Sequence, residues 1–309
     1  MEGIELTGPE FAGMRGAYAA MFTPFDAKGR VDTEKVAQLM DYGYGNGLNG
    51  FYLTGSTGEW WLLGTEERKA VYRAAAKANK GRGKLIAHVG ANRTEDSVEL
   101  ARAAADAGID WVSSIAPQLY RTSFDAAFYH YRTIAEATDL PFMIYCLRTD
   151  LVPDRDVKFF DIKNVKGVKY TGRDYYSAQR LKRRIGKETI WFAGCDEQLV
   201  CALALGNVFS GGIGTTYGII PKHFANICRL AFEEKFREAA KWQAEANRVV
   251  EMMIEDDNWN YRKAMLKFIG LDIGESPAPV GEPVPAAKME DFLSRLAALG
   301  ILKPARSAR

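Results

Sequence analysis

Lys169 is the residue of this sequence whose position most directly suggests chemistry, because it lies near the end of the short segment Asn164–Gly172. The valines of this segment favour a buried strand, and its terminal asparagine and glycine favour turns. A lysine here either keeps its ammonium group in solvent or is buried, so that its amine can attack a ketone and form a Schiff base. Strand alternation places the neighbouring Lys166 on the opposite face, so at most one of the two points into a common interior.

Two other segments carry groups that fit the same chemistry. Tyr145 ends a short apolar segment, and its phenol could relay a proton. The segment Gly55–Gly58 offers the hydroxyls of Ser56 and Thr57 and accessible backbone N–H groups, which suit a carboxylate, although an ordinary tight turn explains it equally well. An amine, a phenol and a carboxylate-binding loop together indicate an enzyme that acts on a 2-oxo acid.

These residues must be positioned by the short apolar segments that alternate with helical patterns along the chain. We expect strands at residues 18–22, 51–53, 85–89, 111–115, 142–145, around Lys169, 190–192 and 208–213. Helices are expected between them, starting near residues 32, 65, 94, 123, 154, 174, 196 and 221. Eight strand–helix units with short loops predict a closed (β/α)8 barrel, the TIM barrel. A doubly wound open sheet is disfavoured, since no GxGxxG motif follows the first strand.

In such a barrel the carboxyl ends of the strands carry the chemistry, so the candidate residues should share one rim. They are Thr23, Thr54 to Glu59, Tyr145, Lys169 with Thr171, Gly194 with Asp196 and Glu197, and Gly214 with Thr215.

The pattern beyond Phe232 is helical only, with helices expected at 235–255, 259–269 and 289–299. A proline-rich stretch at 277–285 is read as a connector, because too little chain follows it to fold alone. We therefore divide the chain into a barrel, residues 1–232, and a C-terminal helical extension, residues 233–309, packed on the barrel.

Composition limits the classes of partner. The 309-residue chain has a net charge of +2, with no basic patch for nucleic acid and no long apolar run for a membrane. Its four cysteines show no CxxC pair and are interpreted as reduced thiols of a cytoplasmic protein. Its three histidines lack metal-ligand spacing, so no metal site is predicted.

The chain resembles the dihydrodipicolinate synthase and N-acetylneuraminate lyase superfamily of Schiff-base aldolases, from Gly16 to about Leu299. The motifs that carry the resemblance are Gly55–Glu59, Met143–Tyr145 and Gly167–Lys169. The resemblance implies that Lys169 forms an imine with a pyruvyl ketone, that Tyr145 relays a proton, and that Ser56 and Thr57 bind the carboxylate, with Lys166 a bystander. It also implies a homo-oligomer, a tetramer or dimer, with the site completed at a subunit contact.

Within the superfamily the match favours the lyase. Gly194–Leu199, Gly212–Tyr217, His88–Ala91 and Thr171 are similar to lyase motifs. The resemblance implies that Asp196 and Glu197 bind sugar hydroxyls, with Gly194, Thr171 and Thr215 also lining the substrate site. Asp196 and Glu197 could instead be acidic residues that favour a helix N-terminus.

The sequence also departs from the family pattern. Tyr145 is followed by Cys146–Asp150, where the family usually has Asn-x-Pro, and Arg148 in this segment either reaches a carboxylate of the substrate or faces solvent. The synthase's relay tyrosine is replaced by Leu119. Tyr120 lies one residue later and is a candidate partner across a subunit contact. The bulky Trp60 and Trp61 either reshape the pocket floor or fill the core.

We therefore predict a lyase that cleaves a 2-oxo acid sugar to pyruvate and an aldehyde, or catalyses the reverse condensation, with no cofactor or metal. N-acetylneuraminate or a related deoxy-2-oxo acid is the expected substrate. Three alternatives remain: a dehydratase of 2-keto-3-deoxy sugar acids, a dihydrodipicolinate synthase-like condensing enzyme, and a non-catalytic paralogue that binds a 2-oxo acid.

Overall fold

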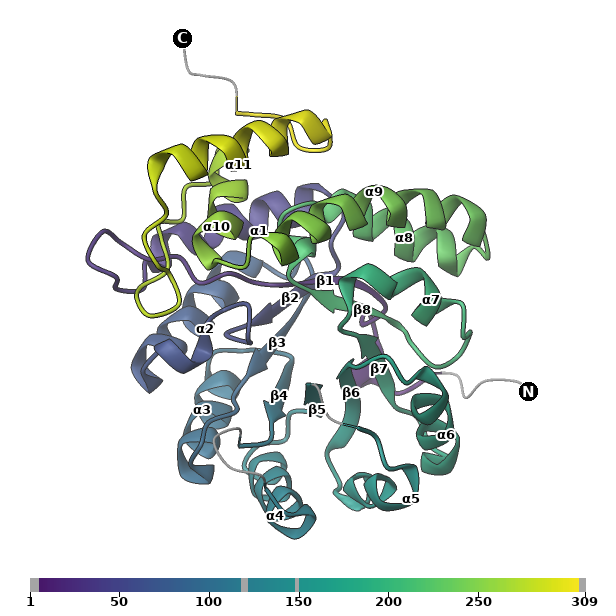
Figure 1. The fold of residues 1–309 in the computed structure, drawn as a ribbon. Helices are drawn as coiled ribbons and strands as arrows, with labels where there is room; N and C mark the ends of the chain where they lie inside the picture. Colours follow the sequence, from purple (N-terminus) through teal and green to yellow (C-terminus); the bar gives the residue numbers. More distant parts are fainter. Residues whose placement is uncertain (1–5, 118–121, 148–149, 306–309) are drawn as a thin grey trace.

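The computed structural model describes residues 6–117, 122–147 and 150–305, and its strands form a closed parallel barrel in chain order (Figure 1). The (β/α)8 barrel predicted from the sequence is confirmed. The strands are β1 (Gly16–Ala20), β2 (Gly50–Leu53), β3 (Lys84–His88), β4 (Trp111–Ile115), β5 (Phe142–Leu147), β6 (Val165–Thr171), β7 (Ile190–Ala193) and β8 (Gly211–Gly214).

A helix follows each strand and lies outside the barrel (Figure 1). Polar residues start several of them: the Ser123 side chain accepts a hydrogen bond from Ala126 N at 3.2 Å, and Asp174 accepts one from Ser177 N at 2.9 Å. The helices are α1 (Val36–Gly45), α2 (Thr65–Asn79), α3 (Thr94–Asp106), α4 (Phe124–Ala135), α5 (Pro153–Asp156), α6 (Tyr175–Ile185), α7 (Leu199–Leu203) and α8 (Pro221–Phe232).

Three further helices follow the barrel: α9 (Phe236–Glu255), α10 (Trp259–Phe268) and α11 (Ala286–Leu299). Figure 1 shows α9 beside α8, with α10 and α11 further along the same side of the barrel. Leu266 of α10 and Phe292 of α11 are fully buried, so these helices pack through apolar faces. No helix in the described part of the chain is both long and apolar enough to cross a membrane.

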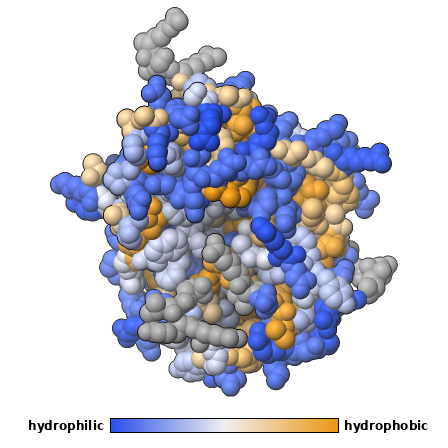
Figure 2. All heavy atoms as spheres, in the orientation of Figure 1, coloured by the Kyte–Doolittle hydropathy of each residue, from blue (hydrophilic) through white to orange (hydrophobic). Residues whose placement is uncertain are grey.

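Alternate residues of the strands belong to two apolar clusters. The smaller cluster fills the barrel interior and includes Tyr52, Tyr145 and Phe192, while the larger one lies between the strands and the helices. Phe11, which precedes β1, joins the interior cluster, and the Trp111 indole donates to Glu10 O at 3.1 Å. The amino-terminal end of the barrel is therefore closed by packing. The surface in Figure 2 is mostly hydrophilic, with small separate hydrophobic areas.

Some element boundaries differ from those predicted. The strand that holds Lys169 continues to Thr171, and β8 begins at Gly211 rather than at residue 208. The Val208 carbonyl instead accepts a hydrogen bond from Lys182 Nζ at 2.8 Å. A glycine begins β8 because a Cβ there would lie 1.9 Å from Gly16 O on the neighbouring strand. The helix expected at 154–160 is α only as far as Asp156 and continues as a 3-10 helix.

Removing the Phe192 ring should test the barrel interior. Phe192 is fully buried and its ring centroid lies 5.1 Å from that of Tyr18, so Phe192→Ala should lower the free energy of unfolding by about 3–5 kcal/mol. Tyr176, which is 67% exposed, provides the control, and Tyr176→Ala should change it by less than about 0.5 kcal/mol. Urea unfolding followed by circular dichroism measures both; equal effects would contradict this packing.

Candidate active site

Lys169 lies inside the barrel, where β6 pairs with β5 and β7. It is opposite Tyr145 on one side and Phe192 on the other, and only 5% of it is exposed. Its Nζ lies 3.7 Å from the centroid of the Tyr145 ring and 5.3 Å from that of Tyr52. The buried alternative for this lysine is therefore the one that the structure shows, with its ammonium group against two aromatic faces.

Tyr145 is the group on which Lys169 acts most directly. Burial alone would raise the pKa of this phenol, but the Lys169 charge and hydrogen bonds from Lys169 and Ser56 outweigh it and lower the pKa below its usual value. Ser56 Oγ lies 3.5 Å from the Tyr145 hydroxyl, and either atom can donate. Thr171 lowers the pKa as well, although its Oγ1 has no partner with hydrogen-bond geometry among the described residues. This arrangement makes Tyr145 a better proton donor than an isolated buried tyrosine and makes its phenolate accessible at lower pH.

The segment Gly55–Glu59, called the β2 loop below, brings its two hydroxyl residues to the same rim. Ser56 faces Tyr145, whereas Thr57 Oγ1 lies 2.6 Å from Thr215 Oγ1 beyond β8. Gly55 leaves room for the Tyr52 ring, which would lie 2.5 Å from a Cβ at that position. The β2 loop thus reaches across the barrel mouth, from Thr215 after β8 through Thr57 and Ser56 to Tyr145 on β5.

Between β7 and β8, two glycines make room for polar side chains. A Cβ on Gly194 would lie 2.0 Å from Thr171 Oγ1, and one on Gly214 would lie 1.8 Å from Asp196 Oδ1. Asp196 is buried, and its Oδ2 accepts a hydrogen bond from Thr216 N at 2.8 Å. Burial raises the pKa of this carboxyl to about 6, although the Thr216 hydrogen bonds oppose the shift.

Glu197 has different partners from those of Asp196. Its Oε1 forms an ion pair with the exposed Arg173 at 3.2 Å, and its main-chain carbonyl accepts from Asn247 of α9 at 3.3 Å. Arg173 lies just beyond β6 and was not predicted as a site residue, because an arginine in a loop resembles any other solvated charge. The two acidic residues are thus held differently, Asp196 by the backbone and Glu197 by a surface cation.

An aromatic wall that the sequence did not predict lies beside Tyr145. The fully buried His88 ring is 6.0 Å from the Tyr145 ring and 5.6 Å from the Trp60 ring, between centroids. Burial, then the nearby Arg68 charge, holds the pKa of His88 well below its usual value, so the imidazole is neutral. Trp60 packs against the barrel interior, but Trp61 is 46% exposed and does not fill the core. The sequence could have indicated His88 as a site residue, because it lies at the carboxyl end of β3.

Lys166 takes no part in this cluster. Its Nζ forms an ion pair with Glu10 at 3.2 Å, near the start of β6, and a register shift between β5 and β6 occurs beside it. Tyr120 and Arg148 lie outside the described residues, so their predicted roles stay predictions. In the described part of the chain no group of three or more His, Cys, Asp or Glu side chains is placed to hold a metal ion.

Comparison with known proteins matches this barrel and rim to one family. The model of the dihydrodipicolinate synthetase family matches residues 13–295. The chain belongs to the dihydrodipicolinate synthetase family. The match spans all eight strands, α9, α10 and most of α11, so the family assignment covers the site and the elements that position it.

Individual proteins that this chain resembles are named as lyases or aldolases. N-acetylneuraminate lyase of Rhizobium meliloti is 33% identical over 270 residues, which are 86% of this chain and 89% of the relative. The solved N-acetylneuraminate lyase of Fusobacterium nucleatum has a TM-score of 0.87 at 29% identity, covering 94% of this chain and 100% of that chain. A catalytic lysine mutant of Ruminococcus gnavus sialic acid aldolase also has a TM-score of 0.87, at 28% identity, with coverages of 94% and 97%.

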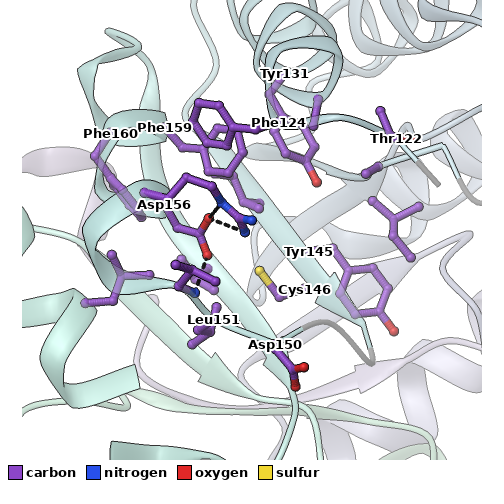
Figure 3. Close-up of a pocket in the computed structure, with 18 of the residues that line it drawn as sticks. Thr122, Phe124, Tyr131, Tyr145, Cys146, Asp150, Leu151, Asp156, Phe159 and Phe160 are labelled. Carbon is purple, nitrogen blue, oxygen red and sulfur yellow. Dashed lines mark hydrogen bonds and ion pairs between the residues drawn. The ribbon is translucent and has the colours of Figure 1, made fainter. Parts of the chain in front are cut away.

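The protein also has a cavity of about 550 Å³ along β5, lined by Tyr145 and Ile115 as well as by Cys146 and Asp156 (Figure 3). Tyr145 and Cys146 are consecutive on the strand, so their side chains point in different directions. Figure 3 shows the Cys146 sulfur directed toward Asp156, whereas the Tyr145 hydroxyl points away from it. Asp156 accepts hydrogen bonds from Arg155 Nε at 2.7 Å and Val152 N at 2.8 Å. Burial raises the pKa of the Cys146 thiol to about 12, so this side of β5 offers no thiolate.

The electrostatic coupling of Lys169 and Tyr145 can be measured directly. Lys169→Met removes the cation and leaves the phenol buried, so the pKa of Tyr145 should rise above its usual value. A pH titration by NMR with ¹³Cζ-labelled tyrosine, assigned through Tyr145→Phe, would report it. Lys166→Met is the matched control and should leave the Tyr145 titration unchanged; the same pKa in both variants would contradict the coupling.

Proposed function

We propose that this protein is a Schiff-base lyase that cleaves, or forms, the carbon–carbon bond between pyruvate and an aldehyde. The observation that carries the proposal is the buried Lys169 amine, 3.7 Å from the centroid of the Tyr145 ring. Membership of the dihydrodipicolinate synthetase family supports a lyase of the aldolase type. Sialic acid aldolase of Ruminococcus gnavus has a catalytic lysine, which supports the choice of Lys169 as the nucleophile.

The proposed reaction begins when the unprotonated Lys169 amine attacks the ketone of a 2-oxo acid. Tyr145 donates its proton to the departing hydroxyl, so loss of water leaves a protonated imine and a Tyr145 phenolate. The imine accepts the electron pair of the C3–C4 bond when that bond breaks, the phenolate takes the proton of the C4 hydroxyl, and the aldehyde leaves. Protonation of the resulting enamine at C3, followed by addition of water, releases pyruvate and restores the amine. Every step uses groups of this chain and water.

The carboxylate of the substrate is assigned to the β2 loop. Ser56 and Thr57 would donate their hydroxyls, and the Thr57–Thr215 contact of 2.6 Å would orient the second of them. Since Ser56 also lies 3.5 Å from the Tyr145 hydroxyl, a carboxylate held there places the ketone next to Lys169. This loop would therefore fix the end of the substrate that reacts with the amine.

The remainder of the substrate is assigned to the β7–β8 side of the rim. Thr171, Gly194, Asp196, Glu197 and Thr215 would contact the hydroxyls of a 2-oxo acid sugar, with N-acetylneuraminate or a related deoxy-2-oxo acid as the first choice. The names of the Rhizobium meliloti and Fusobacterium nucleatum relatives support this substrate class. Loss of water without cleavage would identify a dehydratase instead, because the carbon skeleton of the product would be intact. A homotetramer or dimer, with Tyr120 near the subunit contact, also remains a proposal.

Trapping with borohydride tests the nucleophile. Incubation with pyruvate and borohydride should add a reduced pyruvyl group to Lys169, located by peptide mass spectrometry, because the hydride reduces the imine irreversibly. Lys169→Met should abolish the labelling, whereas Lys166→Met should retain it. Absence of labelling in the folded wild-type protein would reject the lyase and favour a non-catalytic 2-oxo acid binding paralogue.

Asp196 should make sugar binding depend on pH. Its pKa of about 6 lies above the usual value, so the carboxylate predominates above this pH and is lost as the pH falls through it. Since only the carboxylate accepts with both oxygens, KM for the sugar substrate should rise about fivefold between pH 6 and pH 5, as the ionised fraction falls. Asp196→Asn should flatten this dependence, and pyruvate trapping, which needs no sugar contact, is the control. A KM that stays constant over this range in the wild type would refute the assignment.

A further inference from the structure

We propose that the buried ion pair between Glu59 and Lys263 positions the β2 loop, so that α10 sets the geometry of the carboxylate-binding hydroxyls. This inference rests on the proposed function, because it assigns the pair to the binding of the substrate's carboxylate. Glu59 and Lys263 are positioning residues here, since neither contacts the reacting atoms. Lys263 comes from the helices that follow the barrel, far from the loop in sequence.

The two charges are buried almost completely. Glu59 is 0% exposed and Lys263 is 2% exposed, and their Oε1 and Nζ atoms lie 3.1 Å apart. Removing two charges from water costs about as much as their attraction returns, so a buried pair is weak support for stability as such. The position of the pair beside the loop therefore needs a reason other than the stability of the fold.

Lys263 connects three parts of the rim. Besides Glu59, its Nζ donates to Thr23 O at 3.0 Å and lies 4.2 Å from the centroid of the Phe25 ring. Thr23 Oγ1 in turn donates to Gly58 O at 2.7 Å, so the β2 loop is attached to the segment after β1 through both Gly58 and Glu59. The ammonium group is the common point of these contacts.

The conformation of the loop requires such an attachment. Glu59 has φ 57° and ψ 38°, in the left-handed region that non-glycine residues rarely occupy, and Thr54 at the other end has φ 47°. Glu59 N also donates to Ser56 O at 3.0 Å, so a change at Glu59 is passed directly to Ser56. Strain of this kind persists where surrounding contacts hold it, and it is frequent at functional sites.

The helix that carries Lys263 is itself fixed on both sides. The Trp259 ring packs edge-on against Phe22, with centroids 6.0 Å apart. Asn260 Oδ1 accepts a hydrogen bond from Ser276 N at 2.9 Å, and its Nδ2 donates to Glu282 O at 3.2 Å. α10 is therefore a rigid support from which the ammonium group reaches the loop.

The experiment compares two ketones, pyruvate and acetone, of which only pyruvate has a carboxylate. The measured quantity is the second-order rate of borohydride trapping at Lys169. In Glu59→Gln and Lys263→Met the pyruvate rate should fall about tenfold to a hundredfold, because Ser56 and Thr57 are displaced, while the acetone rate changes less than about twofold. Lys267→Met is the matched control, since Lys267 is one turn further along α10, is 69% exposed and forms an ion pair with Asp272. It should change neither rate.

A double variant keeps the test valid if one unpaired buried charge prevents folding. Glu59→Gln with Lys263→Met removes both charges of this pair and leaves neither unpaired, so it should fold, yet it should still lose the preference for pyruvate. An equal fall with both ketones, or a double variant with the wild-type preference, would overturn the positioning role. Wild-type protein that is not labelled by pyruvate at all would reject the proposed function itself, which is a separate outcome.

Discussion

The placement of the Lys169 amine inside the barrel is the constraint on which the rest of the site depends. An ammonium group with 5% exposure must find its partners within the protein, and it finds them in the faces of Tyr145 and Tyr52. The same charge lowers the pKa of the Tyr145 phenol against the effect of burial. One buried lysine thus sets the pKa of the proposed proton relay through its charge, and in its unprotonated form it is the nucleophile of the proposed reaction.

Space on the rim is controlled by glycine. Gly194 and Gly214 leave the volume that Thr171 and Asp196 occupy, since a Cβ on either would lie within 2.0 Å of their oxygens. The polar side of the site therefore depends on the missing side chains just after β7 and at the end of β8 as much as on the polar residues themselves. On the opposite side the aromatic rings of His88 and Trp60 close the wall, which gives the two halves of the mouth different chemical character.

The helices after the barrel are part of the same argument. Lys263 of α10 reaches the β2 loop, and Asn247 of α9 contacts the Glu197 carbonyl, so both halves of the rim are tied to this region. The predicted division at residue 232 separates the barrel from the helices that follow it in the chain. The Glu59–Lys263 ion pair nevertheless links the β2 loop of the barrel to α10. A barrel without α10 would bury Glu59 with no cation beside it.

The sequence by itself determined the periodic pattern of the chain, and with it the barrel, the order of its strands and the position of Lys169 and Tyr145 near strand ends. These follow from local periodicity and from the rule that parallel strand ends share one rim. Only the tertiary structure decided that Lys169 rather than Lys166 is buried against Tyr145, that Glu197 pairs with Arg173, and that Lys263 meets Glu59. Such pairings join residues distant in the chain, and they depend on burial and side-chain direction, which sequence periodicity does not encode.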